Sequence, residues 1–179
     1  MVYLAGGNKV DVGYVAENIK KALDDIAIRQ FSEFGKCDFS NWDTAIKKAI
    51  NGNLESLKDI GYNGEIKDHS VAISILNFIG NNKKKGTEIR KNFQQSPFGW
   101  PQDAIDTMLI LLRLSENIST AETNLNQTRI GAAEFVKETH TISTAEKIEI
   151  RKLYQIAGIS CKSTEEMHHS TTFLDKMKA

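Results

Sequence analysis

The sequence predicts a mainly α-helical protein, and three observations carry this expectation. Apolar residues recur at steps of three or four along most of the chain, as they do on one face of an α-helix. Capping residues precede many of these stretches, and glycines follow them. Near the middle, three helical stretches are followed by two stretches rich in Thr, Ile, Val and Phe, which is the order of elements in a winged helix.

Composition and charge set the broad class of the protein. The chain has 179 residues, of which 40% are hydrophobic and 26% charged, so it can build one domain or two small ones. Lys plus Arg and Asp plus Glu both number 23, so the net charge is zero. This balance argues against strong electrostatic binding of nucleic acid by the whole chain, although a local basic patch can still bind.

Cysteine usage and hydropathy indicate a cytoplasmic protein that does not enter a membrane. Cys37 and Cys161 stand outside any metal-like spacing, so both are expected to be thiols of a reducing compartment. No apolar run approaches the roughly 20 residues that span a bilayer. The N-terminus lacks the basic and apolar blocks of a signal peptide.

Residues 1–66 are expected to form a helical unit that begins with a helix over 12–30. The apolar face of this helix consists of Val12, Val15, Ile19, Leu23 and Ile26. The loop that follows is expected to tuck its aromatic residues under the helix, and these are Phe31, Phe34 and Phe39.

Two further helices complete this first unit. One of them is capped by Ser40 or Asn41 and stops at Gly52. The other is short, with Asn53 as its cap and Gly61 as its end.

Residues 67–142 are expected to form a winged-helix-like domain, after a boundary in the Gly- and Asn-rich stretch 61–70. Its first helix ends at Gly80, and Thr87 is a candidate cap for the second. A tight corner then leads into the third helix and consists of Gly99, Trp100 and Pro101. The third helix, over 101–117, is so apolar that most of its circumference is expected to be buried.

Two strands are expected to follow the third helix and to form the wing. Their residues are 116–123 and 132–142, with a turn-rich stretch over 124–131 between them. Residues 143–179 are expected to form a C-terminal helical segment.

Capping signals introduce both helices of that segment. Ser143 and Glu146 form a capping box before a helix that ends at Gly158. Ser163 and Glu166 repeat the signal before a second amphipathic helix.

A cluster of basic side chains is the candidate binding site. The candidates for phosphate or DNA contact are Lys83, Lys84, Lys85, Arg90 and Lys91, together with Arg129 of the wing. The alternative is a solvated charged face without a ligand. The helix that would read a major groove offers few polar side chains, namely Gln102, Asp106, Thr107, Arg113 and Glu116. Two of these five are acidic, so sequence-specific DNA recognition is disfavoured.

No motif of enzyme chemistry is evident in the sequence. There is no phosphate-binding loop, no G-x-S-x-G and no HExxH. The stretch "GNNKKKGT" has basic residues and two glycines, but it has neither the spacing of a phosphate loop nor a strand before it. We therefore expect no catalytic residue, no metal site and no cofactor, and in particular no binding or hydrolysis of ATP.

Three blocks of the sequence resemble one known family. They are "SPFGWPQDAIDTMLILL", "NQTRIG" and "TISTAEKIEIRKLYQIAGISCKSTEE". In order and spacing they are similar to a stretch of the large P-loop ATPase of bacterial BREX phage-defence systems (BrxC/PglY type). The resemblance implies a fragment outside the ATPase motifs, with no catalytic residue to carry over. It also implies that the partners are the other components of the defence system.

Three hypotheses about function follow. The first is a non-catalytic interaction module of such an ATPase. The second is a winged helix that contacts the phosphates of duplex DNA weakly and without sequence preference. The third is a small enzyme whose site the sequence does not reveal.

Overall fold

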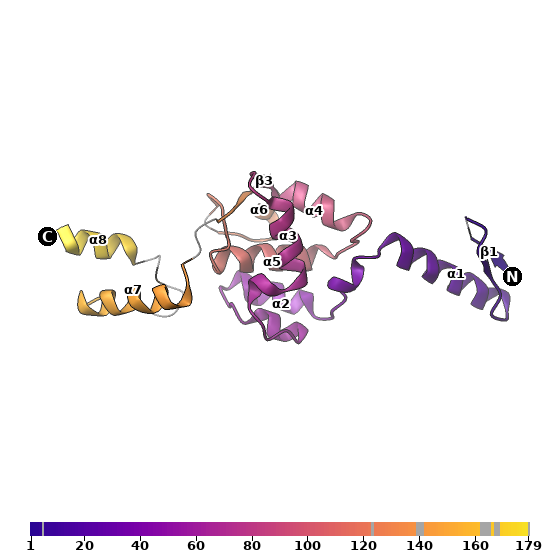
Figure 1. Cartoon of the computed structure of the whole chain (residues 1–179), viewed down its shortest axis with the longest axis horizontal. Coiled ribbons are helices and arrows are strands. Elements are labelled where there is room, and N and C mark those ends of the chain that lie inside the picture. Colours follow the sequence, from indigo (N-terminus) through magenta and orange to yellow (C-terminus); the bar gives the residue numbers. More distant parts are fainter. Residues whose placement is uncertain (5, 123, 139–141, 162–165, 167–168, 179) are drawn as a thin grey trace. The chain divides into compact units, whose positions relative to one another are not determined.

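Helices dominate the structure, which confirms the prediction of a mainly helical protein (Figure 1). The computed structural model divides the chain into two units, Met1–Lys137 and Glu138–Ala179. It describes the chain except for residues 5, 123, 139–141, 162–165, 167–168 and 179.

The first unit holds most of the secondary structure. Its helices are α1 (Val15–Gln30), α2 (Trp42–Ile50), α3 (Ser70–Ile79), α4 (Gly86–Gln94), α5 (Gln102–Leu114) and the short α6 (Gln127–Ile130). Three 3₁₀ turns join them, η1 (Phe34–Lys36), η2 (Ser56–Ile60) and η3 (Ile66–Asp68). Its strands are β1 (Val2–Tyr3), β2 (Lys9–Val10), β3 (Lys84–Lys85), β4 (Ile118–Ser119) and β5 (Glu134–Lys137).

Helix α1 packs against an N-terminal hairpin that the sequence did not predict. Strands β1 and β2 pair antiparallel, and Val10 of β2 and Leu4, which follows β1, pack against Ala22 of the helix. Asn18 is also buried, where its side chain accepts a hydrogen bond from the Val12 amide at 2.6 Å. The predicted apolar face of the helix lies elsewhere and is exposed.

The loop after α1 also differs from the prediction that its aromatic side chains tuck under the helix. Phe31 lies against Gly99, and Phe34 is more than a third exposed. Phe39 packs edge-on against Trp42 at 6.3 Å between ring centroids. Phe31 therefore packs at the corner before α5, and Phe39 packs against α2.

A three-stranded antiparallel sheet closes one side of the central helices. Its strand order is β3-β5-β4, with Lys84 opposite Phe135 and Ser119 opposite Val136. Strands β4 and β5 fall within the predicted stretches but are shorter, and α6 occupies part of the turn-rich segment between them. Strand β3 is a further element that the sequence analysis missed.

Helix α4 begins directly after β3. Its N-cap is Lys85 and not the predicted Thr87. Gly86 donates its amide to the Ala133 carbonyl at 2.9 Å, which extends the β3–β5 pairing into the helix. A Cβ at this position would collide with the carbonyl of Ile130, so only glycine allows the backbones to approach this closely.

One hydrophobic core joins α2 to the later helices of this unit and to β4 and β5. Helix α5 lies at its centre, and α2, α3 and α4 pack around it (Figure 1). Nine consecutive residues of α5, Ala104–Leu112, are buried, which agrees with the predicted burial of this helix. Residues on both sides of the predicted boundary at 66 thus share one core.

Several predicted helix ends are confirmed, and the region after α2 shows both an agreement and a difference. Helix α2 has Asn41 as its N-cap, and Gly61 ends the short turn after it. That turn is a 3₁₀ helix capped by Glu55, where an α-helix capped by Asn53 was expected. The side chain of Asn53 instead accepts the Glu55 amide at 2.8 Å.

The second unit contains α7 (Thr144–Ile156) and α8 (Ser170–Lys178). The predicted capping box is present, because Ser143 accepts the amide of Glu146 at 3.3 Å and Glu146 accepts the amide of Ser143 at 2.7 Å. The predicted cap Ser163 lies outside the described residues. In the described part of the chain, no helix has the length and apolarity to cross a membrane.

The predicted corner before α5 is a packed structural feature. Gly99 has a positive φ of 65°, and a Cβ there would lie 2.6 Å from the ring of Phe31. Trp100 stacks on Phe93 with ring centroids 4.7 Å apart, and its Nε1 donates to the Glu33 carbonyl at 3.0 Å. Pro101 is the N-cap residue of α5, so the helix begins one position later than the predicted start at residue 101.

We expect Trp100→Ala to lower the free energy of unfolding by about 3 kcal/mol, because the ring is buried and its loss leaves a cavity. Urea unfolding measures the change. Tyr3→Ala, which truncates an exposed aromatic side chain, should stay within about 0.5 kcal/mol of the parent. A similar urea midpoint for the parent and Trp100→Ala would contradict the role of the corner.

Candidate functional site

Four lysines of the predicted basic patch lie around the start of α4. The side chains of Lys83, Lys85 and Lys91 are exposed. Lys84 is half-buried, and its ammonium lies 5.2 Å from the ring centroid of Phe78. Strand β3 fixes the backbone of Lys84 and Lys85 by pairing with β5, whereas Lys91 lies on α4.

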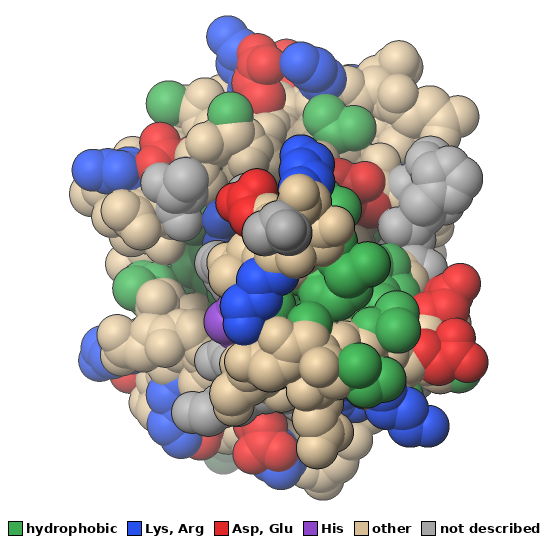
Figure 2. Space-filling view, turned by 90° about the vertical axis from the view of Figure 1, so that its left-hand side faces the viewer, with side chains coloured by type: hydrophobic (Ala, Val, Ile, Leu, Met, Phe, Trp, Pro, Cys, Tyr) green, Lys and Arg blue, Asp and Glu red, His purple; other side chains and the backbone are tan. Residues whose placement is uncertain are grey.

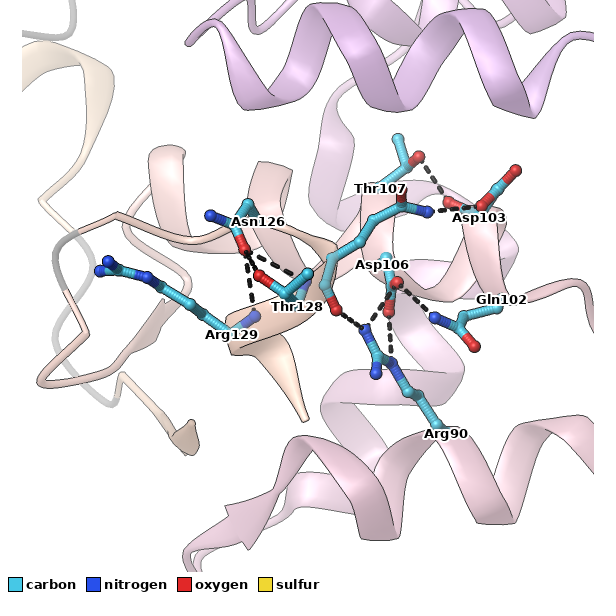
Figure 3. A network of polar contacts seen from close by, with 9 residues as sticks. Arg90, Gln102, Asp103, Asp106, Thr107, Asn126, Thr128 and Arg129 are labelled. Atoms are coloured by element: carbon cyan, nitrogen blue, oxygen red, sulfur yellow. Dashed lines mark hydrogen bonds and ion pairs between the residues drawn. The ribbon is translucent and has the colours of Figure 1, made fainter. Parts of the chain in front are cut away.

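Arg90 belongs to the same predicted patch, but its guanidinium points into the core (Figure 3). Its Nε and Nη2 donate to the two carboxylate oxygens of Asp106, each at 2.8 Å. The same Nη2 donates to the carbonyl of Gln127 at 2.7 Å. The Asp106 side chain is 0% exposed and that of Arg90 16%, so this is a buried bidentate ion pair.

Burial and pairing shift the pKa of Asp106 in opposite directions, and burial, the larger effect, raises it overall. Burial raises the pKa of its carboxyl, whereas the hydrogen bonds and the charge of Arg90 lower it. A hydrogen bond from Gln102 at 3.3 Å also favours the carboxylate. The bidentate geometry matches an ionised carboxylate that accepts two N–H groups. Arg90 and Asp106 are therefore best understood as one unit that holds α4 against α5.

The polar network continues into α6 (Figure 3). Asn126 caps this short helix by accepting the amides of Thr128 and Arg129 at 3.1 and 3.0 Å. Gln127 donates its side-chain amide to Asp103 of α5 at 2.7 Å. The side chain of Arg129, the last predicted phosphate contact, is half-exposed and bonds Glu122 at 2.9 Å.

The structure thus separates the six predicted contact residues into two groups. Lys83, Lys84, Lys85 and Lys91 present ammonium groups near one another in the chain. Arg90 and Arg129 are engaged by carboxylates, and Arg90 has little surface left for a phosphate. An anion would therefore meet lysines, which act as flexible point charges and do not read geometry.

The side chains expected to face a major groove are partly inside the protein. Asp106 and Thr107 are fully buried, and Thr107 donates its hydroxyl to the Asp103 carbonyl at 2.6 Å. Sequence reasoning missed the Arg90–Asp106 pair because the partners lie on different helices. The available signal was a lone acid, Asp106, among large apolar residues of α5.

A second buried polar group lies where η3 meets α3. His69 is 2% exposed, and its Nδ1 accepts the Val71 amide at 3.2 Å, which caps the helix. Rings of Phe39, Trp42 and Tyr62 surround it, the nearest centroid at 4.7 Å. Burial lowers the pKa of His69, which favours the neutral ring that can accept this hydrogen bond.

Charges of both signs are interspersed on the face of the molecule shown in Figure 2, next to hydrophobic side chains. Among the residues that the structure describes, no group of three or more His, Cys, Asp or Glu is arranged to hold a metal ion. The chain matches no protein-family model, no curated protein and no solved structure.

We expect Arg90→Met to lower the free energy of unfolding by about 3–5 kcal/mol, because it leaves the charge of Asp106 buried and unpaired. Urea unfolding of the full chain measures this. The matched control is Lys91→Met, the same change at the next, exposed position, which should cost less than about 0.5 kcal/mol.

The double variant Arg90→Met, Asp106→Leu should recover most of the lost stability, since it removes both charges together. If Arg90→Met and Lys91→Met are equally stable, the ion pair does not hold α4 and α5 together.

Proposed function

We propose that this chain is a non-catalytic interaction module, built on a winged helix, within a larger cytoplasmic P-loop ATPase of the kind found in BREX phage-defence systems. Its partners would be the other components of that system. The proposal combines the sequence resemblance with the way in which the resembling residues are used in the fold.

The order of elements supports the winged-helix part of the proposal. From α3 to β5 the chain runs helix, strand, helix, helix, strand, strand, with α6 inserted between the last two strands. The antiparallel sheet places its last strand between the other two, in the order β3-β5-β4. A winged helix has this order, in which the third helix, here α5, would be the one that enters a DNA groove.

The observation that carries the proposal is the burial of α5. Helix α2 packs along it, and residues Ala104–Leu112 are buried without interruption. A helix that reads base edges must present polar side chains to the major groove. In this chain Asp106 and Thr107 are buried and Gln102 donates to Asp106, which favours contacts with protein over base reading.

The resembling blocks support the same conclusion. Residues of "PFGWPQDAID" form the corner and supply Asp103 and Asp106, while "NQTRIG" supplies Gln127 and the cap Asn126. The two blocks therefore meet in one network, and their side chains have structural partners. A motif that is used in this way specifies a module with a fixed shape, as an interaction domain requires.

The exposed lysines favour one second candidate, which is weak binding to duplex DNA without sequence preference. Lys83, Lys85 and Lys91 are solvated cations close together in the chain, and the ammonium of Lys84 lies over the ring of Phe78. Such side chains neutralise phosphates and release counterions, so the affinity would depend steeply on salt.

If the DNA candidate is right, duplex DNA should bind the chain weakly at low salt, and the double variant Lys84→Glu, Lys85→Glu should weaken that binding. Where binding is measurable, fluorescence anisotropy at several salt concentrations should show the slope of log K against log salt reduced by about two. The matched control, Lys47→Glu, Lys58→Glu, makes the same charge change at exposed lysines elsewhere. No binding at low salt would exclude the DNA candidate.

We expect the tagged chain to co-purify with at least one other component of a BREX-type system when the two are co-expressed. Nuclease treatment and the Lys84→Glu, Lys85→Glu variant should leave this complex intact, because protein contacts do not depend on the lysines. Failure to co-purify with any component would contradict the proposed function. Loss of the complex on nuclease treatment would show that DNA had bridged the proteins.

A further inference from the structure

Helix α1 carries an apolar stripe that its own chain leaves uncovered. The stripe consists of Val12, Val15, Ile19, Leu23 and Ile26, whose residues are between 44% and 68% exposed. Val15, Ile19, Leu23 and Ile26 lie on one face of α1, a helix of 16 residues about 24 Å long, and Val12 precedes the helix. A continuous apolar face of this kind normally marks a contact with another protein surface.

The stripe is held in place from one side. Asn18 and Ala22 are buried against the N-terminal hairpin, and Asn18 also donates to the Gly13 carbonyl at 3.0 Å. The hairpin therefore covers one flank of the helix and supports it, while the stripe and the opposite flank stay exposed. The open flank carries Lys20 and Asp24, which are both exposed and one turn apart.

We propose that a second copy of this chain covers the stripe, with the two α1 helices antiparallel across a two-fold axis. The charges of the helix decide between this and other occupants. Along α1 they run Glu17, then Lys20 and Lys21, then Asp24 and Asp25, then Arg29. Lys21 and Asp25 pair with each other within the helix at 2.6 Å. Reading the order backwards reverses the sign at every step, so an antiparallel copy brings the lysines of one helix level with the aspartates of the other, and Lys20 and Asp24 are the pair on the open flank.

The register follows from the apolar side chains. With the axis midway between Ile19 and Ile26, each of these residues faces the other in the partner copy. Position 20 of one copy then lies level with position 25 of the other, so Lys20 is one residue away from level with Asp24 on the same open flank, and the pair occurs twice. A parallel copy in register would instead place each charge beside its own counterpart, which is unfavourable.

A groove at the C-terminal end of α1 extends the surface. It has a volume of about 620 Å³ and is lined by Ala27, Phe31 and Phe34 among others. The antiparallel copy brings its exposed Val12 and Tyr14 level with this groove. Apolar side chains of the partner thus meet an apolar concave surface next to the stripe.

The area of the contact indicates a weak interaction. The stripe by itself buries on the order of 400 Å² per copy, about half of the roughly 800 Å² per partner in a standard stable interface. The groove adds to this area. We therefore expect a reversible dimer with a Kd on the order of 10–100 μM.

The first test is sedimentation equilibrium of the full chain from about 5 to about 500 μM, a range that brackets the expected Kd. The parent should change from monomer to dimer. Ile19→Lys should raise the Kd on the order of 100-fold, because each contact occurs twice in a two-fold dimer and the substitution removes both. The matched control Ile73→Lys, at an equally exposed isoleucine of α3, should leave the Kd unchanged.

The second test decides the orientation by mixing two charge variants. Lys20→Glu makes the open flank acidic and Asp24→Lys makes it basic, so each variant alone should dimerise roughly tenfold more weakly than the parent. An equimolar mixture should form the heterodimer with the parent's affinity or better, because Glu at position 20 then lies near Lys at position 24. Circular dichroism checks that each variant is folded.

Three results would overturn the proposal. They are a monomer at every concentration, a dimer that Ile19→Lys leaves unchanged, and a mixture of the charge variants that associates no better than either variant alone. The proposal does not rest on the proposed function, since the dimer is measured without DNA or any other component.

Discussion

The burial of α5 is the constraint on which the rest of the structure depends. Nine consecutive residues of this helix are inside the protein, and two of them, Asp106 and Thr107, are polar. A buried carboxylate is tolerated only when it is paired and hydrogen-bonded. Arg90 meets this requirement from α4 with two bonds of 2.8 Å, and the Gln127 carbonyl accepts a further bond from its guanidinium. One ion pair thus links α4, α5 and the segment before β5.

This linkage changes how the basic segment is understood. Its five cations are neighbours in sequence, but the fold sends Arg90 inward and leaves the lysines at the surface. The same residues that carry the sequence resemblance serve the corner, the ion pair and the cap of α6. These residues stabilise the fold, and a module of fixed shape is what the proposed contact with a partner requires.

Helix α1 shows the limit of periodicity as a guide to burial. A spacing of three and four establishes that a helix has an apolar face, but not what covers that face. The hairpin of β1 and β2 takes the neighbouring flank through Ala22, and the stripe itself stays exposed. An unsatisfied apolar face on a well-formed helix is a reason to look outside the monomer.

The sequence by itself determined the local features of this protein. Helix positions, the ends at Gly61 and Gly80, the capping box at Ser143 and the burial of α5 follow from periodicity and capping, which act over a few residues. Only the tertiary structure decided the Arg90–Asp106 pair, strand β3 and the exposure of the α1 stripe. The pair and the strand depend on groups 16 or more residues apart, and the exposure depends on which surfaces meet, so short-range patterns carry no record of them.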